Sequence, residues 1–523
     1  MFYTAFFKNL MGLNALLFSL FVIGSTAYLF PENFKRLQAL AAAAAALFSA
    51  GIVLWHSSAM AIFVWVSSLI LFIPMVQYAK IRSVHWAGIT AFIDYITVFD
   101  HLKIEKTQTK SRKNNRRFRI IQSLKLAIIP VIVLIIFFAL FKEANPVFDE
   151  LSTNFFEAIN DFIKEYFGNI SFLDFLFLLW GFITLSWMLL KKRKDYIAAK
   201  EQDFDETISR KRKVKKQTIN YIAKGNLKPK LKNEYRVGMM LMIMVNALLL
   251  IVNIIDIDWV WLNFEYEGEI NLTQFVHEGT YLLILSILIS MGIILYFFRK
   301  NLNFYHKKKN LQITAYIWIV QNAVLAVSVA LRNMHYINEY GLAYKRIGVF
   351  FFLCLVIVGL ISLIVKITNK KSFFYLMKVN SWAVWIGFLL FAVPDWDIII
   401  AKHNISDKVK QETDLKFLMQ LDEKAFPVID KNMPNLKNRS SDTYFHRFGY
   451  TTFEKTFYAK VNEFLEEYQD RNFAEFNFAD KKSYEYFRDK YGKELSQKHD
   501  NKNDTAKNNI KNDFTRGIIN KKK

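Results

Sequence analysis

The segment IGVFFFLCLVIVGLISLIV, residues 347–365, runs without one charged side chain and is dominated by Ile, Leu, Val and Phe. A helix of about 20 such residues is long enough to cross the roughly 30 Å hydrocarbon core of a bilayer. Similar windows recur at residues 10–30, 37–55, 58–78, 120–141, 172–190, 237–255, 276–298, 311–331 and 379–394. One window alone would also fit a buried helix of a soluble protein. Ten together predict an all-α polytopic membrane protein with about ten transmembrane helices.

Three of these windows are open to another interpretation. Window 37–55 is rich in Ala and only mildly hydrophobic, and window 379–394 is short, so a re-entrant or tilted segment is an alternative for both. The first window resembles a cleaved secretory signal. We expect an uncleaved span instead, because a single Lys8 precedes it and bulky residues continue to Phe30.

Lys and Arg gather in alternating connections, and basic residues in short loops stay in the cytoplasm. Segments 79–119 and 191–236 are strongly basic, so we place both inside. Loops 142–171 and 256–275 are acidic, so we place both outside. Much of the net charge of +23 is then a topology signal. The alternation puts the N-terminus and the region from Asp395 outside, in the periplasm, if the membrane is a bacterial inner membrane.

These shifts in composition divide the chain into five parts. They are 1–78, N-terminal transmembrane helices; 79–119, a basic cytoplasmic loop with an amphipathic helix; 120–394, a transmembrane domain that includes the basic cytoplasmic segment 191–236; 395–496, an extracytoplasmic helical module; and 497–523, a disordered polar tail. We expect the amphipathic helix over residues 83–100, with a short additional span as the alternative.

The stretch ALRNMHYINEYGLAYKR, residues 330–346, places cations on the outer side, where the positive-inside rule disfavours them. An arginine can hold a carboxylate or phosphate bidentately, and Gly341 suits a helix C-cap or a sharp re-entry. Other polar residues fall on the same face: Asn145, Asp256, Asp258, His277, Glu278 and Asp395. Charge inside a membrane is costly and usually paired. We therefore expect Arg332 and Arg346 to pair with acids of this set.

Two interpretations of this outer network stay open. It either ties helix ends together or forms a pocket for an anionic headgroup or a carboxylate. The candidate binding residues are Arg332, Tyr336, Tyr340, Gly341, Arg346, His277, Glu278 and Asn145, with Asp256, Asp258 and Asp395 as ion-pair partners. Catalysis is disfavoured, because His277 and Glu278 are adjacent on a helix and point about 100° apart.

Three short segments carry a family resemblance: ANPVF (144–148), QFVHEGTYLLI (274–284) and RNMHYINEYGLAYKR (332–346). They resemble the signature regions of the bacterial inner-membrane family catalogued as domain of unknown function 4173, with its broader relative 4153. The resemblance covers roughly residues 120–430. Arg332, Tyr336, Tyr340, Gly341, Leu342 and Arg346 match the third region, and Ala343 stands where that family has Thr. The resemblance implies an integral membrane protein and supplies no catalytic residue.

Motifs for specific chemistry are missing from the sequence. There is no Walker A sequence, GxSxG, HExxH, paired CxxC or Rossmann fingerprint, so we predict no catalytic residue, cofactor or metal. The basic run RKRKVKK (210–216) lacks interleaved aromatic residues, so we expect no nucleic-acid partner.

The expected function is therefore that of a non-enzymatic envelope protein. We expect it to bind an anionic lipid headgroup or a carboxylate partner at its extracytoplasmic face. Its partners would be membrane lipids and an envelope protein or lipid-linked ligand. A secondary transporter and a membrane-embedded transferase acting on lipid-linked substrates are the alternatives.

Overall fold

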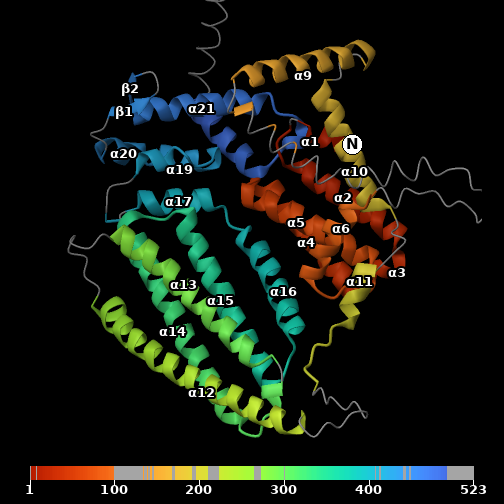
Figure 1. Cartoon of the computed structure of the whole chain (residues 1–523). Coiled ribbons are helices and arrows are strands. Elements are labelled where there is room, and N and C mark those ends of the chain that lie inside the picture. Colours follow the sequence, from red (N-terminus) through yellow and green to blue (C-terminus); the bar gives the residue numbers. More distant parts are fainter. Residues whose placement is uncertain are drawn as a thin grey trace, which may run out of the picture.

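The computed structural model shows two groups of long helices beneath a layer of shorter ones (Figure 1). It describes residues 2–7, 9–98, 134, 138, 142–143, 146–167, 171–190, 196–209, 223–263, 272–299, 301–406, 408–410, 414–439, 443–446 and 449–491. The expected tail 497–523 lies outside the described residues, as does the expected span 120–141 apart from Leu134 and Phe138.

Seven helices within the described ranges are long and apolar enough to cross a membrane. They are α4 (Leu37–His56), α5 (Ala59–Gln77), α10 (Phe172–Leu189), α12 (Ala223–Asp256, continued by η2, Ile257–Leu262), α14 (Lys308–Tyr340), α15 (Tyr344–Thr368) and α16 (Phe373–Phe391). Two further apolar helices are shorter, α2 (Leu13–Leu29) and the Tyr281–Phe297 part of α13 (Leu272–Phe297). An α-helical membrane protein is thus confirmed, whereas the expected count of ten spans is not.

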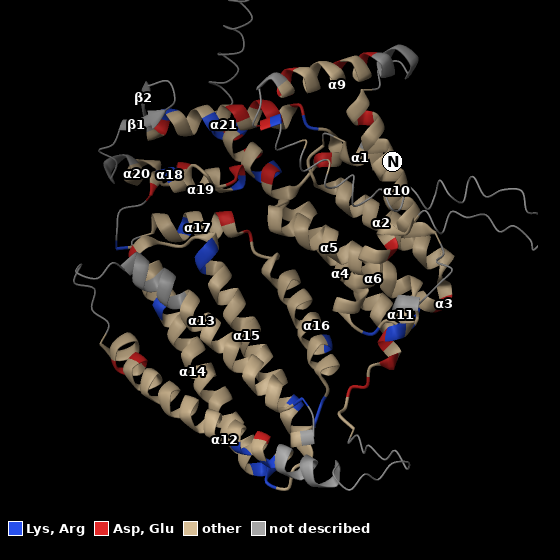
Figure 2. Cartoon of the chain, in the orientation of Figure 1, with Lys and Arg blue, Asp and Glu red and all other residues tan. Residues whose placement is uncertain are grey.

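Charged residues are distributed as a membrane protein requires. Figure 2 shows Lys, Arg, Asp and Glu concentrated at the two ends of the long helices, with uncharged residues between them. Many large apolar side chains on these helices are exposed, for example Met240, Leu282 and Leu390 at 64%, 65% and 64%. Such surfaces are stable against lipid and unstable against water.

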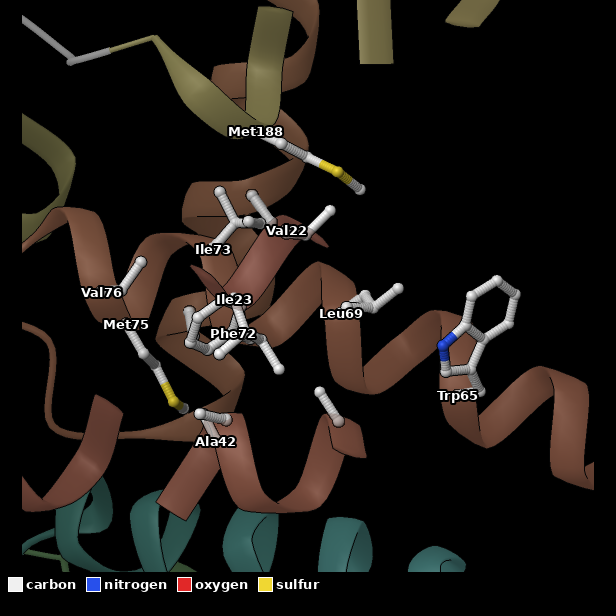
Figure 3. Close-up of a cluster of buried hydrophobic side chains, with 14 of the residues drawn as sticks. Val22, Ile23, Ala42, Trp65, Leu69, Phe72, Ile73, Met75, Val76 and Met188 are labelled. Carbon is white, nitrogen blue, oxygen red and sulfur yellow. The ribbon is translucent and has the colours of Figure 1, made fainter. Parts of the chain in front are cut away.

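The N-terminal group contains α2, α4, α5, α10 and α6 (Val84–Ile96), with the short α1 (Phe2–Phe6), α3 (Pro31–Phe34), α11 (Tyr196–Lys200) and η1 (Glu201–Asp203) around it. Helix α4 packs along α5 and α2 through a face of small residues that are all buried: Ala39, Ala42, Ala43, Ala46 and Ala50. Figure 3 shows Ala42 among the larger side chains of α2 and α5, including Val22, Phe72 and Met75. Small residues let membrane helices approach closely.

Helix α6 occupies the place of the expected amphipathic helix. It buries Val84, Ala87 and Ala91 against the protein and leaves Ile89 and Phe92 exposed at 44% and 69%. Its neighbours are α5, α10, α11 and α16, so it is packed into the N-terminal group and does not form a separate surface helix.

The second group contains α12, α13, α14, α15 and α16, with η3 (Asn301–Phe304) at one end. A seam of polar side chains joins α12 to α14. Asn246 Nδ2 donates to the Thr314 carbonyl (3.1 Å), Gln321 Nε2 to Asn246 Oδ1 (3.0 Å), Asn253 Nδ2 to the Gln321 carbonyl (3.1 Å) and Trp261 Nε1 to Ser328 Oγ (2.9 Å). Thr314, Gln321 and Ser328 repeat every seven residues, which keeps one face of α14 turned to its partner.

The C-terminal module forms the layer on top. It comprises α17 (Trp396–Ile405), α18 (Leu415–Leu418), η4 (Glu423–Ala425), α19 (Phe426–Lys431), α20 (Met433–Arg439), α21 (Phe453–Gln469), η5 (Phe473–Glu475) and a helix over residues 478–491. It was expected to be helical, and it also contains an antiparallel hairpin of β1 (Thr443–His446) and β2 (Gly449–Thr452). Helix α9 (Pro146–Phe167) lies across the same end of the molecule (Figure 1).

The core of the module is aromatic, and several side chains of the module donate hydrogen bonds to one buried acid. Phe457, Phe464 and Phe487 are at most 2% exposed. The Asp430 carboxylate accepts hydrogen bonds from Lys490 Nζ (2.6 Å) and from the hydroxyls of Tyr458, Tyr486 and Tyr491 (2.9, 2.6 and 2.9 Å). Burial alone would raise the pKa of Asp430, but these donors outweigh it and lower that pKa.

Contacts at both ends connect the groups to each other. At the module end, Lys424 Nζ donates to the His56 carbonyl at the end of α4 (2.8 Å). At the opposite end, Trp382 Nε1 of α16 donates to the Arg82 carbonyl (3.2 Å). The guanidinium of Arg82 in turn donates to the Glu201 carbonyl (2.8 Å).

Candidate anion-binding site at the α14 to α15 connection

Most of the stretch 330–346 is helix, although it was expected to form an outer connection. Helix α14 continues to Tyr340, and only Gly341, Leu342 and Ala343 link it to α15. The Gly341 N–H donates to the Ile337 carbonyl (2.8 Å) and so closes the last turn. The chain then reverses within three residues.

Gly341 is required at this reversal for two reasons. Its φ of 79° and ψ of −176° fall in a region that is essentially restricted to glycine. A Cβ at this position would also lie 2.5 Å from Asn404 Oδ1 on α17. Gly341 stood out in the sequence as a residue suited to a helix C-cap or a sharp re-entry, and the structure gives it this conformational role.

The Asn404 side chain forms two hydrogen bonds with the backbone of the connection, as the backbone of a neighbouring β-strand would. Its Oδ1 accepts from the Leu342 N–H (2.5 Å), and its Nδ2 donates to the Leu342 carbonyl (2.9 Å). From α14, Asn333 Nδ2 donates to the Arg346 carbonyl (2.9 Å). Asn404 was not among the expected site residues, because nothing in the sequence around it marks it as a partner of residue 342.

Arg332 forms an ion pair with Asp256. Its Nη2 lies 2.5 Å from Asp256 Oδ1, and the two side chains are only 9% and 5% exposed. The pair joins α14 to the end of α12, next to the polar seam. Because its charge is neutralised inside the protein, Arg332 is not available as the main receptor for an external anion.

Arg346 has a different environment. Its Nη1 donates to the carbonyls of Tyr340 and Gly341, the last residue of α14 and the residue after it, and its guanidinium lies 4.3 Å from the centre of the Tyr336 ring. Within the described part of the chain, no acid forms an ion pair with Arg346. The side chain lines a pocket of about 160 Å³, which we call the Arg346 pocket. Its other lining residues are Tyr340, Gly341, Leu342, Ala343, Asn404, Val409, Asp414 and Phe417.

Of the remaining expected residues, Asp258 and Asp395 have described side chains, and neither lines this pocket. Asp258 Oδ1 accepts from the Asn263 amide (3.1 Å). Asp395 is the N-cap of α17. His277 and Glu278 lie in the first turns of α13, where the structure describes the backbone only, and Asn145 lies outside the described residues.

A second charged cluster beside α17 was not expected from the sequence. Lys424 is 3% exposed, and its Nζ lies 3.2 Å from Asp422 Oδ2 and 3.9 Å from Asp397 Oδ2. Burial alone would lower the pKa of Lys424, but Asp422, Asp395 and Asp397 outweigh it and raise that pKa. Asp397 also accepts from the Tyr344 hydroxyl, which links this cluster to the start of α15.

Two acids at this cluster hold their protons unusually well. Burial raises the pKa of Asp395 to about 6, with Lys424 opposing the shift and Asp397 adding to it. Burial and the neighbouring Asp422 raise the pKa of Glu423 to about 7. Across the described residues, no group of three or more His, Cys, Asp and Glu side chains is arranged to hold a metal ion.

These features define an α-helical membrane protein with a structured polar end. The amino-acid sequence also matches a known family. The model of the family described as Domain of unknown function (DUF4153) matches residues 15–432, so the chain belongs to that family. The resemblance drawn from three short segments is thereby confirmed. The match also extends over the N-terminal group, well before residue 120, where the resemblance was expected to begin. No curated protein and no solved structure matches the chain.

Proposed function

We propose that this protein is a non-enzymatic membrane protein of the bacterial cell envelope that binds an anionic group in the Arg346 pocket. The anion would be a lipid headgroup or a carboxylate of a partner. The observation that carries this proposal is the contrast between two arginines. Arg332 is neutralised by Asp256, whereas Arg346 lines a pocket without an acid paired to it in the described chain.

The geometry around Arg346 suits a compact anion. Two hydrogen bonds to carbonyls fix the guanidinium without exhausting its five N–H donors. The pocket volume of about 160 Å³ is several times the roughly 30 Å³ that one water takes in the liquid. Asp414 lines the same pocket, but its Oδ1 already accepts from the Phe417 N–H as the N-cap of α18.

The structure also changes the part that Arg332 plays in this proposal. We assign it a positioning role, because it ties α14 to α12 directly below the turns that carry Tyr336 and Tyr340. The proposed ligand contacts are therefore Arg346 and the polar groups around Gly341, with Tyr336 supporting the guanidinium.

The sidedness of the pocket is part of the proposal. The pocket and the C-terminal module share one end of the molecule, and the basic loops after α5 and α10 leave from the other end. By the positive-inside rule the loops are cytoplasmic, so the module and the pocket face the periplasm.

The test is native mass spectrometry of the detergent-purified protein. The lipids retained by the wild type are compared with those retained by Arg346→Gln and Arg346→Lys. Arg299→Gln is a matched control, because Arg299 also lies over a tyrosine ring, that of Tyr296 at 3.6 Å, but at the opposite end of the molecule. We expect Arg346→Gln to lose one anionic lipid class, Arg346→Lys to retain part of it, and the control to retain all of it. An unchanged lipid profile together with lower thermal stability would mean that Arg346 only caps α14.

Transport is a second candidate, and the polar seam between α12 and α14 favours it. The seam from Thr314 to Ser328, continued by the His335 Nε2 contact with the Val260 carbonyl (3.1 Å), extends over 21 residue steps of helix. At 1.5 Å per residue this is about 32 Å, the thickness of the hydrocarbon core. A transporter would lose flux into proteoliposomes on Gln321→Leu, whereas a structural seam would lose only stability.

A further inference from the structure

A larger cavity lies between the end of α4 and the C-terminal module. Its volume is about 560 Å³, within the range of small-molecule sites. Five lysines line it, Lys402 of α17, Lys424 of η4, Lys431 of α19 and Lys481 and Lys482 of the helix 478–491, together with Trp55 of α4. We call this the lysine cavity.

The charges of the lysine cavity do not balance. Among the described residues that line it, two acids, Asp395 and Glu485, stand against the five lysines. Lys424 is engaged by Asp422 and Asp397, and Lys481 Nζ lies 3.8 Å from Glu485 Oε1. Lys402 and Lys482 are exposed, and neither forms an ion pair within the described chain. Lys431 lies 5.2 Å from the centre of the Tyr486 ring, also without a described acid partner.

The position of the cavity indicates where its ligand comes from. Trp55 lies in the last turn of α4, which is long and apolar enough to span a membrane. Trp55 is 62% exposed and contacts Phe478 of the module with ring centres 5.8 Å apart. Exposed tryptophans at helix ends sit at the level of the lipid headgroups. The cavity therefore opens at the depth where phosphate groups are concentrated.

We propose that the lysine cavity is a binding site for a phosphate-bearing anion, with Lys402, Lys431 and Lys482 as its cations. The phosphate belongs either to the headgroup of an anionic lipid or to a soluble phosphate ester. Clustered like charges repel one another, and a bound anion removes this repulsion.

This site is independent of the Arg346 pocket. The two share no lining residue. Lys402 and Asn404, which lines the Arg346 pocket, are two residues apart on α17 and therefore point to nearly opposite sides of that helix. The proposal for this site can therefore be tested separately from the function proposed above. All variants below are made in the Arg346→Gln background, so that binding in the Arg346 pocket does not contribute to the result.

The experiment is a binding titration of the full-length protein in detergent. The probes are short-chain phosphatidylglycerol, short-chain phosphatidylcholine, glycerol 3-phosphate and inorganic phosphate. The test variant is Lys402→Gln with Lys482→Gln. The control is Lys408→Gln with Lys416→Gln, two exposed lysines of the same module that do not line the cavity. Thermal unfolding checks that each variant is folded.

We expect phosphatidylglycerol to bind at least tenfold more tightly than phosphatidylcholine. A cation near an anionic headgroup contributes a factor of roughly five, so the test variant should bind phosphatidylglycerol about 25-fold more weakly. The control should stay within about twofold of its background.

The soluble probes distinguish the two sources of phosphate. Competition by glycerol 3-phosphate or inorganic phosphate that is lost in the test variant would show that the phosphate alone suffices. Binding of the lipid alone, lost in the same variant, would show that the acyl chains are needed as well. Equal binding of phosphatidylglycerol by the test variant and its background, or no preference for any of the anionic probes over phosphatidylcholine, would overturn the proposal.

Discussion

At the scale of single residues, Arg332 and Arg346 show how one helix end uses two cations differently. Arg332 is buried against Asp256, and its charge serves the contact between α14 and α12. Arg346 donates to a carbonyl at the end of α14, and its side chain also lines the Arg346 pocket. Both stood out in the sequence as cations on a face where cations are rare, but only the three-dimensional structure separates their roles.

The Arg332 pair gives the first prediction. Arg332→Ala leaves the Asp256 carboxylate buried without its partner, so we expect a loss of about 3–5 kcal/mol in the free energy of unfolding. The double variant Arg332→Met with Asp256→Asn removes both charges and should recover most of that loss. Thermal unfolding in detergent measures both. Equal stability of Arg332→Ala and the wild type would contradict the burial of this pair.

Gly341 gives the second prediction. Gly341→Ala forces a Cβ into a backbone region that costs about 1–3 kcal/mol for a residue other than glycine, and it also brings that Cβ against Asn404. Adding Asn404→Ala relieves the contact but not the backbone strain. We therefore expect the double variant to be no more stable than Asn404→Ala alone. If Gly341→Ala unfolds at the wild-type temperature, the proposed conformation is wrong.

Asp395 gives the third prediction, a dependence of stability on pH. The pKa of Asp395 is raised to about 6 in the folded protein, against about 3.9 when unfolded. Between these values the folded state binds more protons, so stability falls as the pH rises from about 4 to about 6 and stays lower above that. Lys424 opposes this effect, while Asp397 and Asp422 add to it.

The measurement is the midpoint of thermal unfolding at pH 5 and at pH 7.5. The raised pKa of Asp395 favours the wild type at pH 5, whereas the pKa of His403, which burial lowers, acts in the opposite direction. Asp395→Asn keeps the capping function at α17, because Asn is also a good N-cap, and should lower the unfolding midpoint at pH 5 relative to that at pH 7.5. Glu423 should still favour pH 5 in this variant, because its pKa is also raised, to about 7. An unchanged difference between the two midpoints in Asp395→Asn would show that its carboxyl group is not the one that titrates.

At the scale of elements, helix α4 shows why a weak hydrophobic window is still a membrane helix. Its alanines add little hydrophobicity, which made residues 37–55 an uncertain span in the sequence. The structure shows that this run faces α5 and α2, where small side chains are needed for close packing. Hydropathy measures transfer into lipid and does not report packing against another helix.

Two alanines of α4 give a matched pair of variants. Ala46 is fully buried, whereas Ala44 is exposed on the other face of the helix. Leucine at position 46 would overpack the contact between helices and cost about 1–3 kcal/mol. Leucine at position 44 adds apolar surface on the lipid side and should be tolerated. The temperature of unfolding should fall for Ala46→Leu only. Equal effects of the two variants would mean that α4 is rotated about its axis and does not turn the Ala46 face toward α5 and α2.

The elements also show where sequence patterns are informative. The long apolar runs predicted the spans α5, α10, α12, α14 and α15, because crossing a bilayer imposes length and composition on one segment at a time. The end of α14 was not predicted correctly. Residues 332–340 carry charge and polar groups, which hydropathy treats as outside the span, although the helix continues to Tyr340.

At the scale of the whole molecule, both candidate sites depend on contacts between distant parts of the chain. The Arg346 pocket needs Asn404 of α17 against the connection after α14, and the lysine cavity combines Trp55 with Lys402 and Lys482. No sequence spacing connects these residues, because the module returns to cover the ends of both helix groups only after the last span. Arg346 and Gly341 were predictable as unusual residues in their own segment, and the lysine cavity was not.

The measurement that tests the account most directly is the sidedness of this end of the molecule, since both proposed sites and the module share it. Single cysteines are introduced as Lys416→Cys, in the module, and Lys307→Cys, just before α14, in a Cys354→Ala background. Both positions are exposed. We expect a membrane-impermeant maleimide to label position 416 in intact cells and position 307 only after the membrane is permeabilised. Labelling of position 307 from outside, with position 416 protected, would place both sites in the cytoplasm and contradict an envelope function at the outer face.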